Sequence, residues 1–181
     1  MSGTDIDAGH KLIQIGLAKY NDTGSVDHIG YLINPGEMTW SMEAQEVHQF
    51  TQEDVKGYGI YPSVVDPITA RWANPGNQKR DFVMVGFNVG SFDRPFIKQQ
   101  LPITYGKFSR RSVDINSVIF AMSDTNSEFE TIKGRAKEYA FEKMDGMFND
   151  FKNRQHDAEY DAVMSLYCFE YLRTLIKGEQ E

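Results

Sequence analysis

The pattern of apolar residues near the start of the chain predicts a β-hairpin. Residues 11–20 are mostly apolar, and residues 29–33 form a second, shorter apolar run. Between them, residues 21–24 have the polar and glycine-containing composition of a turn. Two apolar runs joined in this way are typical of two strands connected by a loop of a few residues.

Further along the chain, apolar residues recur in steps of three and four, which predicts helices. Ser41, Thr51 and Ser91 are expected to cap three of them, because their side chains can accept hydrogen bonds from a first helical turn. The expected helices cover residues 41–47, a turn from 51, and residues 63–72, 92–101, 114–122, 128–143 and about 155–176.

One apolar run in the middle of the chain, residues 81–87, is almost continuous and predicts a buried strand. Strands therefore come first and near the middle, and helices fill the rest. In a chain of 181 residues without repeats or linkers, this order indicates one α/β domain over residues 1–181, with helices packed on a sheet.

The charge and the cysteine content exclude several classes of function. The formal net charge is −7, so no basic field over the whole chain attracts long nucleic acid, although a local site can bind nucleic acid ends. Cys168 is the only cysteine, which excludes disulfides and cysteine zinc sites and fits a reducing, cytoplasmic location. No apolar run reaches transmembrane length, so we expect no membrane association.

The densest basic group is Lys107, Arg110 and Arg111. We expect these residues to lie in a solvated loop. The alternative is that they contact a phosphate backbone, since lysine and arginine neutralise phosphates in nucleic acid complexes.

Candidate chemistry begins with His156 and Asp161 at the start of the last expected helix. Five residues span about 140° around a helix, so the two side chains do not share a face. They can meet over one pocket only if His156 lies in the first turn. A histidine and a carboxylate beside one cleft can act as general base and metal ligand. Alternatively, the histidine caps the helix or lies on the surface.

A second stretch, residues 87–93, lies where the buried strand is expected to end and the next helix to begin. In α/β proteins, ligands bind at such strand ends. Asp93 falls in the first helical turn beside this crevice. The alternative is that Asp93 only complements the positive end of the helix dipole.

Together these stretches resemble two motifs of the DnaQ-like 3′–5′ exonucleases of the DEDDh group, in the ribonuclease-H-like superfamily. Phe87-Asn88-x-x-x-Phe92-Asp93 is similar to the second motif of that family, and His156-x-Ala158-x-x-Asp161-Ala162 is similar to the third. Residues 12–16 resemble the strand after the first motif, and residues 43–55 resemble the helix and turn before the second. The order and the intervals match across almost the whole chain.

The resemblance implies a ribonuclease-H-like mixed sheet with helices on both faces. It implies a hydrolase that removes nucleoside monophosphates from the 3′ end of DNA or RNA, using two divalent cations, Mg²⁺ or Mn²⁺, that clamp the scissile phosphate. The implied roles are metal ligands for Asp161 and Asp93, general base for His156, and substrate binding for Asn88, Phe92 and His48. His48 could equally be a surface or capping residue.

The first motif of the family, an Asp-x-Glu at the end of a strand, has two possible counterparts. Asp5 and Asp7 could be a degenerate version and serve as weak metal ligands. Alternatively, Ser2 and Gly3 are the remainder of the turn that follows the motif, and residues 4–10 are the next loop. The loop length favours the second interpretation, in which the first central strand is absent.

On that interpretation we expect residues 1–181 to fold poorly and to show negligible exonuclease activity. The alternative function is a catalytically inactive or truncated exonuclease-fold domain. Such a domain would act as a nucleic-acid-binding or interaction module.

Overall fold

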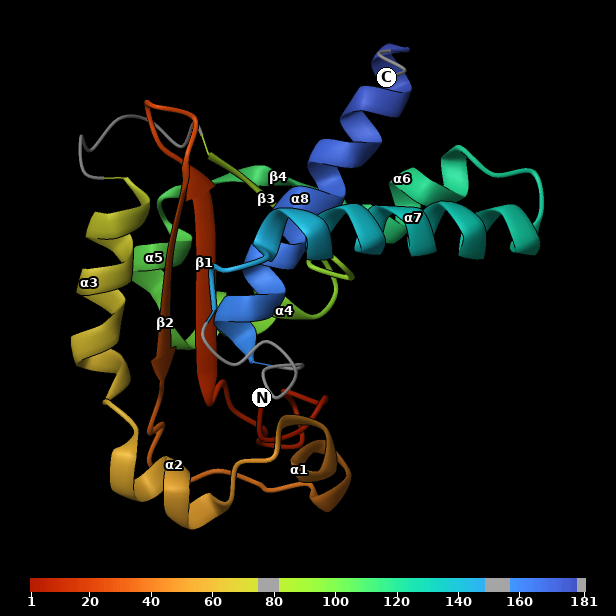
Figure 1. Ribbon diagram of the computed structural model, residues 1–181. Coiled ribbons are helices and arrows are strands. Elements are labelled where there is room, and N and C mark those ends of the chain that lie inside the picture. The colour runs from red at the N-terminus through yellow and green to blue at the C-terminus, as the bar shows by residue number, and fades with distance from the viewer. Residues whose placement is uncertain (75–81, 149–156, 179–181) are drawn as a thin grey trace.

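The computed structural model describes residues 1–74, 82–148 and 157–178 (Figure 1). Within these ranges the chain forms four strands, in two separate sheets, and eight helices. The predicted mixed α/β composition is confirmed. The described strands do not form the single mixed sheet that we expected, because each pairs with only one other strand.

The first sheet is the predicted hairpin. Strand β1 (Gln14–Tyr20) pairs antiparallel with β2 (Val26–Leu32), which begins three residues earlier than expected. The turn between them is held by Asn21, whose side-chain oxygen accepts hydrogen bonds from the backbone N–H groups of Thr23 and Ser25, each at 3.0 Å. In the register of the hairpin, Gly16 lies directly opposite Gly30.

Three helices follow the hairpin: α1 (Met42–His48), α2 (Gln52–Tyr58) and α3 (Pro62–Ala73). The predicted caps are confirmed, since Ser41 accepts from the N–H of Ala44 and Thr51 accepts from the N–H of Asp54. The Asp54 carboxylate in turn accepts from the N–H of Thr51, which completes a capping box.

The second sheet pairs β3 (Phe82–Gly86) with β4 (Phe108–Asp114) in parallel, and α4 (Asp93–Gln100) and the short α5 (Pro102–Tyr105) connect them. The loop predicted around Arg110 and Arg111 is therefore wrong, because these residues belong to β4. Their polar side chains gave no apolar signal, and only pairing with a distant strand holds them extended. Ser91 does not cap α4; its hydroxyl donates to the Asn88 carbonyl at 3.3 Å.

The remaining helices are α6 (Ile115–Ala121), α7 (Asn126–Met144) and α8 (Ala158–Lys177). Helix α8 packs against both α7 and the β1–β2 hairpin, and its last turns extend beyond them (Figure 1). Ile176 lies in this extension and is 62% exposed although it is apolar. The predicted residues 155 and 156 of this helix lie outside the described ranges.

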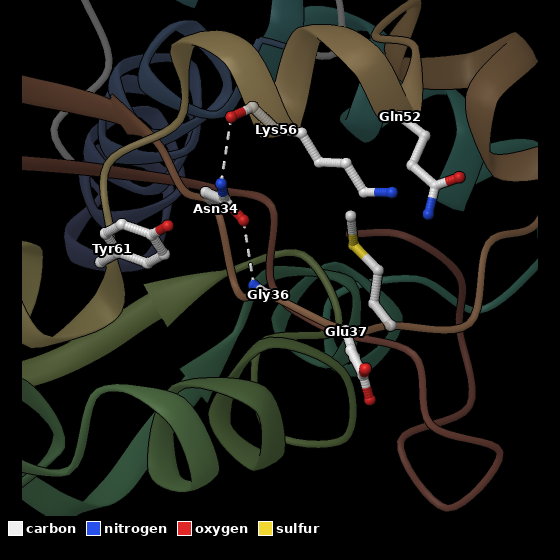
Figure 2. Close-up of a pocket in the computed structure, with 7 residues that line it drawn as sticks. Asn34, Gly36, Glu37, Gln52, Lys56 and Tyr61 are labelled. Carbon is white, nitrogen blue, oxygen red and sulfur yellow. Dashed lines mark hydrogen bonds between the residues drawn. The ribbon is translucent and has the colours of Figure 1, made fainter.

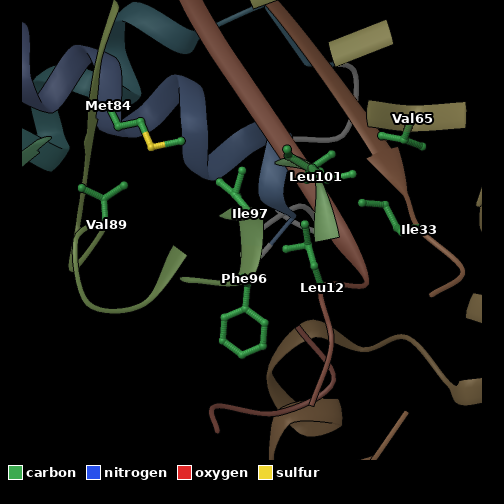
Figure 3. Packing of buried hydrophobic residues seen from close by; sticks show 9 residues of the cluster. Leu12, Ile33, Val65, Met84, Val89, Phe96, Ile97 and Leu101 are labelled. Atoms are coloured by element: carbon green, nitrogen blue, oxygen red, sulfur yellow. The ribbon is translucent and has the colours of Figure 1, made fainter. Parts of the chain in front are cut away.

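Strand β3 separates two apolar cores. Met84 packs with residues of β1, α3 and α4, and this cluster is shown in Figure 3. Val85, its neighbour in the strand, packs instead on the cluster formed by α6, α7 and α8. The predicted burial holds only for this half of the strand, since Phe82 and Val83 are 40% and 43% exposed. Among the described strands, β3 has one neighbour, β4, and this leaves the side chains at its start partly exposed.

A buried carboxylate in α3 holds the start of α5. Asp66 is 4% exposed, and its oxygens accept hydrogen bonds from the backbone N–H groups of Ile103 (2.9 Å) and Thr104 (2.7 Å). The Thr104 hydroxyl also contacts Asp66 and the Thr69 hydroxyl, at 2.7 and 2.6 Å. Asp66 therefore acts as a helix cap supplied by another helix.

We expect Asp66→Ala to lower the free energy of unfolding by about 2–3 kcal/mol, because it leaves buried backbone donors at α5 without acceptors. Urea denaturation followed by circular dichroism measures this change. Asp124→Ala is the matched control, since the Asp124 residue is exposed. Equal stability of the two variants would contradict the capping role.

Candidate active site

The position of Asp161 is set by the first turn of α8. Asp157 is the N-cap, and its side chain accepts from the N–H groups of Glu159 (3.0 Å) and Tyr160 (3.2 Å). The N–H of Ala158 is left for another acceptor, and Gln14 in β1 supplies its side-chain oxygen at 3.0 Å. The hairpin thus completes the cap of the helix that carries Asp161.

Two glycines let this helix start approach the hairpin closely. A methyl group at Gly16 would overlap the backbone of Ala158 and Glu159, and one at Gly30 would lie 2.7 Å from the Cβ atom of Glu159. Because Gly16 and Gly30 face each other across the hairpin, they form one gap without side chains. The backbone of α8 occupies this gap.

Polar contacts fix the same helix along the length of the hairpin. The Glu159 carboxylate lies 2.7 Å from Nδ1 of His28 in β2, and the hydroxyl of Tyr20, at the end of β1, donates to Glu170. The β1 segment from Gln14 to Tyr20 spans roughly 20 Å. The α8 segment from Ala158 to Glu170 spans roughly 18 Å, so the contacting parts of the helix and the strand have nearly the same length.

Asp93 is the first residue of α4 and is half-buried. The pKa of its carboxyl is raised to about 6, chiefly by burial. A backbone hydrogen bond and the Met1 amino group oppose the shift, and the negative charge of Asp161 adds a smaller increase. The Asp161 charge thus acts on Asp93 from a helix far away in the sequence, although these two described carboxylates make no hydrogen bond with each other that would define a shared site.

The amino group of Met1 lies in the same region. Burial lowers its pKa to about 6, and the nearby Asp93 carboxylate opposes that shift. Ser2 holds this segment in place: its N–H donates to the Lys11 carbonyl at 2.8 Å, and its carbonyl accepts from the N–H of Ser41, also at 2.8 Å. The start of the chain is thus fixed between the beginning of β1 and the cap of α1.

His48, the last residue of α1, also lies near the Met1 amino group. Burial lowers the pKa of its imidazole to about 4, and the positive Met1 group lowers it further. Its Nδ1 atom accepts from the N–H of Phe50 at 3.1 Å, so the neutral ring carries its proton on Nε2. Nε2 is buried and has no hydrogen-bond partner among the described residues.

The other predicted substrate residues lie in the segment between β3 and α4. Asn88 has a positive φ of 56°, and its carbonyl accepts from the N–H of Phe92 at 2.9 Å. Its side-chain oxygen accepts from Asn116 at 3.2 Å, at a pocket of about 410 Å³ where β3 and β4 end. Neither Asp93 nor Asp161 lines this pocket. Phe92 is half-buried and makes an edge contact with Phe96.

Asp5 and Asp7 lie in the exposed loop before β1. The Asp5 carboxylate accepts hydrogen bonds from the backbone N–H groups of Asp7 (2.9 Å) and Ala8 (3.2 Å), which gives it a local role in the turn. His156, the predicted general base, lies outside the described residues.

The carboxylates that meet can be compared with the needs of a metal ion. Mg²⁺ is commonly held by one or two carboxylates and several waters, so Asp93 and Asp161 match the ligands of one such ion in chemical type. Within residues 1–74, 82–148 and 157–178, no three His, Cys, Asp or Glu side chains form a group that could hold a metal.

A further pocket, of about 390 Å³, lies between the segment after β2 and helix α2 (Figure 2). Its floor is Asn34, which is buried, donates to the Lys56 carbonyl at 3.1 Å and accepts from the N–H of Gly36 at 3.0 Å. Lys56 and Tyr61 are exposed at its rim. None of the predicted site residues lines it, and the turn composition at Asn34 was its only signal in the sequence.

Comparison of the sequence with models of known protein families, and with curated proteins, found no match. Among the helices in the described ranges, none combines the length and the apolar character needed to cross a membrane.

We expect Gly16→Ala to displace the start of α8 and with it Asp161, because the new methyl group would overlap the Ala158 carbonyl. Core backbone shifts of this kind cost about 1–3 kcal/mol. Thermal unfolding measures the loss. Gly134→Ala is the control: Gly134 lies in α7 with open space around it, and alanine should stabilise that helix slightly. A Gly16→Ala protein as stable as the wild type would refute the close approach.

Proposed function

We propose that this chain is a metal-dependent 3′–5′ exonuclease that releases nucleoside monophosphates from DNA or RNA. Support for the proposal comes from the two sequence motifs together with the effect of the Asp161 charge on the Asp93 carboxyl, which is small beside that of burial. These are the two described residues that the motifs name as metal ligands, and they come from helices α4 and α8, which are far apart in the sequence. A purely dipole-complementing Asp93 would need no such neighbour.

We propose a ribonuclease-H-like arrangement for the fold. The supporting features are the antiparallel hairpin, the parallel β3–β4 pair and the packing of the last helix on the hairpin. Shared architecture alone would not establish an activity, since one fold supports many functions. The argument for catalysis therefore stays with the carboxylates.

Asp93 and Asp161 would hold a divalent cation, Mg²⁺ or Mn²⁺. Such a cation, when bound, polarises a phosphoryl oxygen and lowers the pKa of a water ligand. The resemblance implies two cations, and the second would need ligands beyond these two residues. We assign the role of general base to His156 from its place in the third motif.

His48 would bind the strand rather than move protons. Its low pKa keeps the ring neutral at physiological pH, so Nε2–H remains a hydrogen-bond donor. A phosphate or sugar oxygen of a 3′-terminal nucleotide is a suitable acceptor. The binding surface would be local, which agrees with a chain whose net charge is −7. We place the protein in the cytoplasm because its one cysteine, Cys168, is a buried free thiol.

The second candidate is a nucleic-acid-binding module without catalysis. It shares the surface of the proposed enzyme and lacks turnover, so the two candidates differ in one measurable property. Metal-independent binding of 3′ ends without digestion would favour the module.

The activity test uses the 181-residue chain and a 3′-labelled single strand, with Mg²⁺ or Mn²⁺. We expect slow digestion, in place of the negligible activity that the absence of the first motif alone predicts, because Asp93 and Asp161 would still hold one cation. We expect Asp161→Ala to abolish it. His156→Ala should slow turnover by about 10²–10⁴-fold, the usual contribution of a general base. Asp124→Ala serves as the control and should digest at the wild-type rate. Digestion that survives Asp161→Ala would refute the proposed site.

The pH dependence of Mn²⁺ binding gives an independent test. Below pH 6 the Asp93 carboxyl is protonated and the Met1 amino group is positive, and both conditions oppose a cation. We therefore expect affinity to rise about ten-fold per pH unit or more between pH 5 and 6, and to level off above pH 7. Calorimetric titration at several pH values measures it, with Asp93→Asn as the variant that weakens binding and flattens the profile. An affinity independent of pH in this interval would contradict the assignment.

A further inference from the structure

The pocket at the ends of β3 and β4 has features that the proposed cleavage does not use. It measures about 410 Å³ and lies where the parallel strands end, beside the first turn of α6 (Figure 1 shows α6 next to α7). Strand ends of this kind are common ligand sites in α/β proteins. Its lining combines aromatic rings with hydrogen-bond acceptors, a combination that restricts the chemistry of a ligand.

The aromatic part of the pocket is Phe120 and Phe129. Phe120 is 71% exposed, although moving a phenylalanine side chain out of water is energetically favourable. Phe129 is half-buried, and the ammonium of Lys133 lies 5.4 Å from its ring centroid. Open aromatic faces of this kind suit a flat ring that stacks on them. The adjacent ammonium suits a phosphate attached to that ring system.

The polar part of the pocket is rich in acceptors. Asn116 donates through its amide nitrogen to Asn88, and its own side-chain oxygen is buried without a hydrogen-bond partner among the described residues. The Asp114 carboxylate, beside it, accepts from the N–H of Ser117 at 3.1 Å as the cap of α6 and adds negative charge. A ligand that donates hydrogen bonds on this side of the pocket would match both acceptors.

We propose that this pocket binds a nucleobase that carries an exocyclic amino group, with the base stacked on Phe120 and its amino group donating to Asn116 and Asp114. Adenine and cytosine have this amino group, whereas thymine and uracil present a carbonyl oxygen at the same position. Lys133 would contact the neighbouring phosphate. The inference deepens the proposed function, on which it rests for the assumption that the base belongs to a strand.

The pocket is joined to the carboxylates by a short rigid segment. Asn88 at its edge accepts from the N–H of Phe92, the residue before Asp93. A strand that reaches Asp93 with its 3′ end could thus place a base further along in the pocket. A free mononucleotide carries the same base, so the two sources of the ligand are tested separately.

The experiment measures equilibrium binding to the 181-residue chain in EDTA, so that no cleavage occurs. The probes are adenosine 5′-monophosphate, inosine 5′-monophosphate, and twelve-nucleotide strands of deoxyadenosine or thymidine. The variants are Phe120→Ala, Phe120→Trp and Asn116→Ala. Tyr58→Ala is the matched control, because Tyr58 is an aromatic residue that is 80% exposed and lines neither pocket.

We expect Phe120→Ala to weaken binding by about ten-fold, which is typical for the loss of one stacked base, while Phe120→Trp and Tyr58→Ala bind like the wild type. Adenosine monophosphate should bind about five-fold more tightly than inosine monophosphate, and Asn116→Ala should reduce that preference. An effect of Phe120→Ala on the strands alone identifies the strand as the source. An effect on the mononucleotides as well identifies the base itself as sufficient.

Binding that is equal for adenosine and inosine monophosphate and for the two strands, or that does not change in Phe120→Ala, would overturn the inference. The two proposals fail separately. If binding depends on Phe120 but the chain does not cleave, the base-pocket proposal is supported and the exonuclease proposal fails. If cleavage depends on Asp161 but binding does not change in Phe120→Ala, the exonuclease proposal is supported and the base-pocket proposal fails.

Discussion

The close approach of α8 to the hairpin is the contact on which the site depends. The backbone of a helix can contact the backbone of a strand only where no side chain lies between them. Gly16 and Gly30, which have no side chains and face each other across the hairpin, allow this contact. The helix start that fits there is tied by Gln14 and capped by Asp157. Because Asp161 is one turn further along, its position follows from this contact. A looser fit would move the carboxylate by the width of a methyl group.

Charge and burial compete in the region where Asp93 and Asp161 meet. Desolvation is the larger cause of the raised pKa of Asp93, and the charge of Asp161 is a smaller one. The Met1 amino group is also partly desolvated there, and its pKa falls for the same reason. The Asp93 carboxylate and the Met1 amine therefore stabilise each other only in part, since each loses hydration on burial.

Most of the local signals in the sequence predicted local structure correctly, with the cap expected at Ser91 as the exception. The caps at Ser41 and Thr51 and the turn at Asn21 depend on residues two to four positions away, and all three are present. Strand β4 depends on pairing with β3, some 25 residues earlier, and its polar sequence carried no sign of that partner. Asp66 was missed for the same reason, because the backbone that it caps belongs to another helix.

The two candidate sites use opposite physical environments, although one short segment connects them. Near Asp93, burial makes charges interact strongly, which suits the binding of a cation and the reaction of a phosphate. At Phe120, an aromatic ring open to solvent gains from covering its face, which suits a base and requires no strong field. A polynucleotide presents both chemistries at a fixed spacing, phosphate and base in every unit. The β3–α4 segment carries Asn88 at the edge of the aromatic pocket and Asp93 at the acidic site, so the two proposed sites would suit such a repeat in a way that a small uncharged ligand would not need.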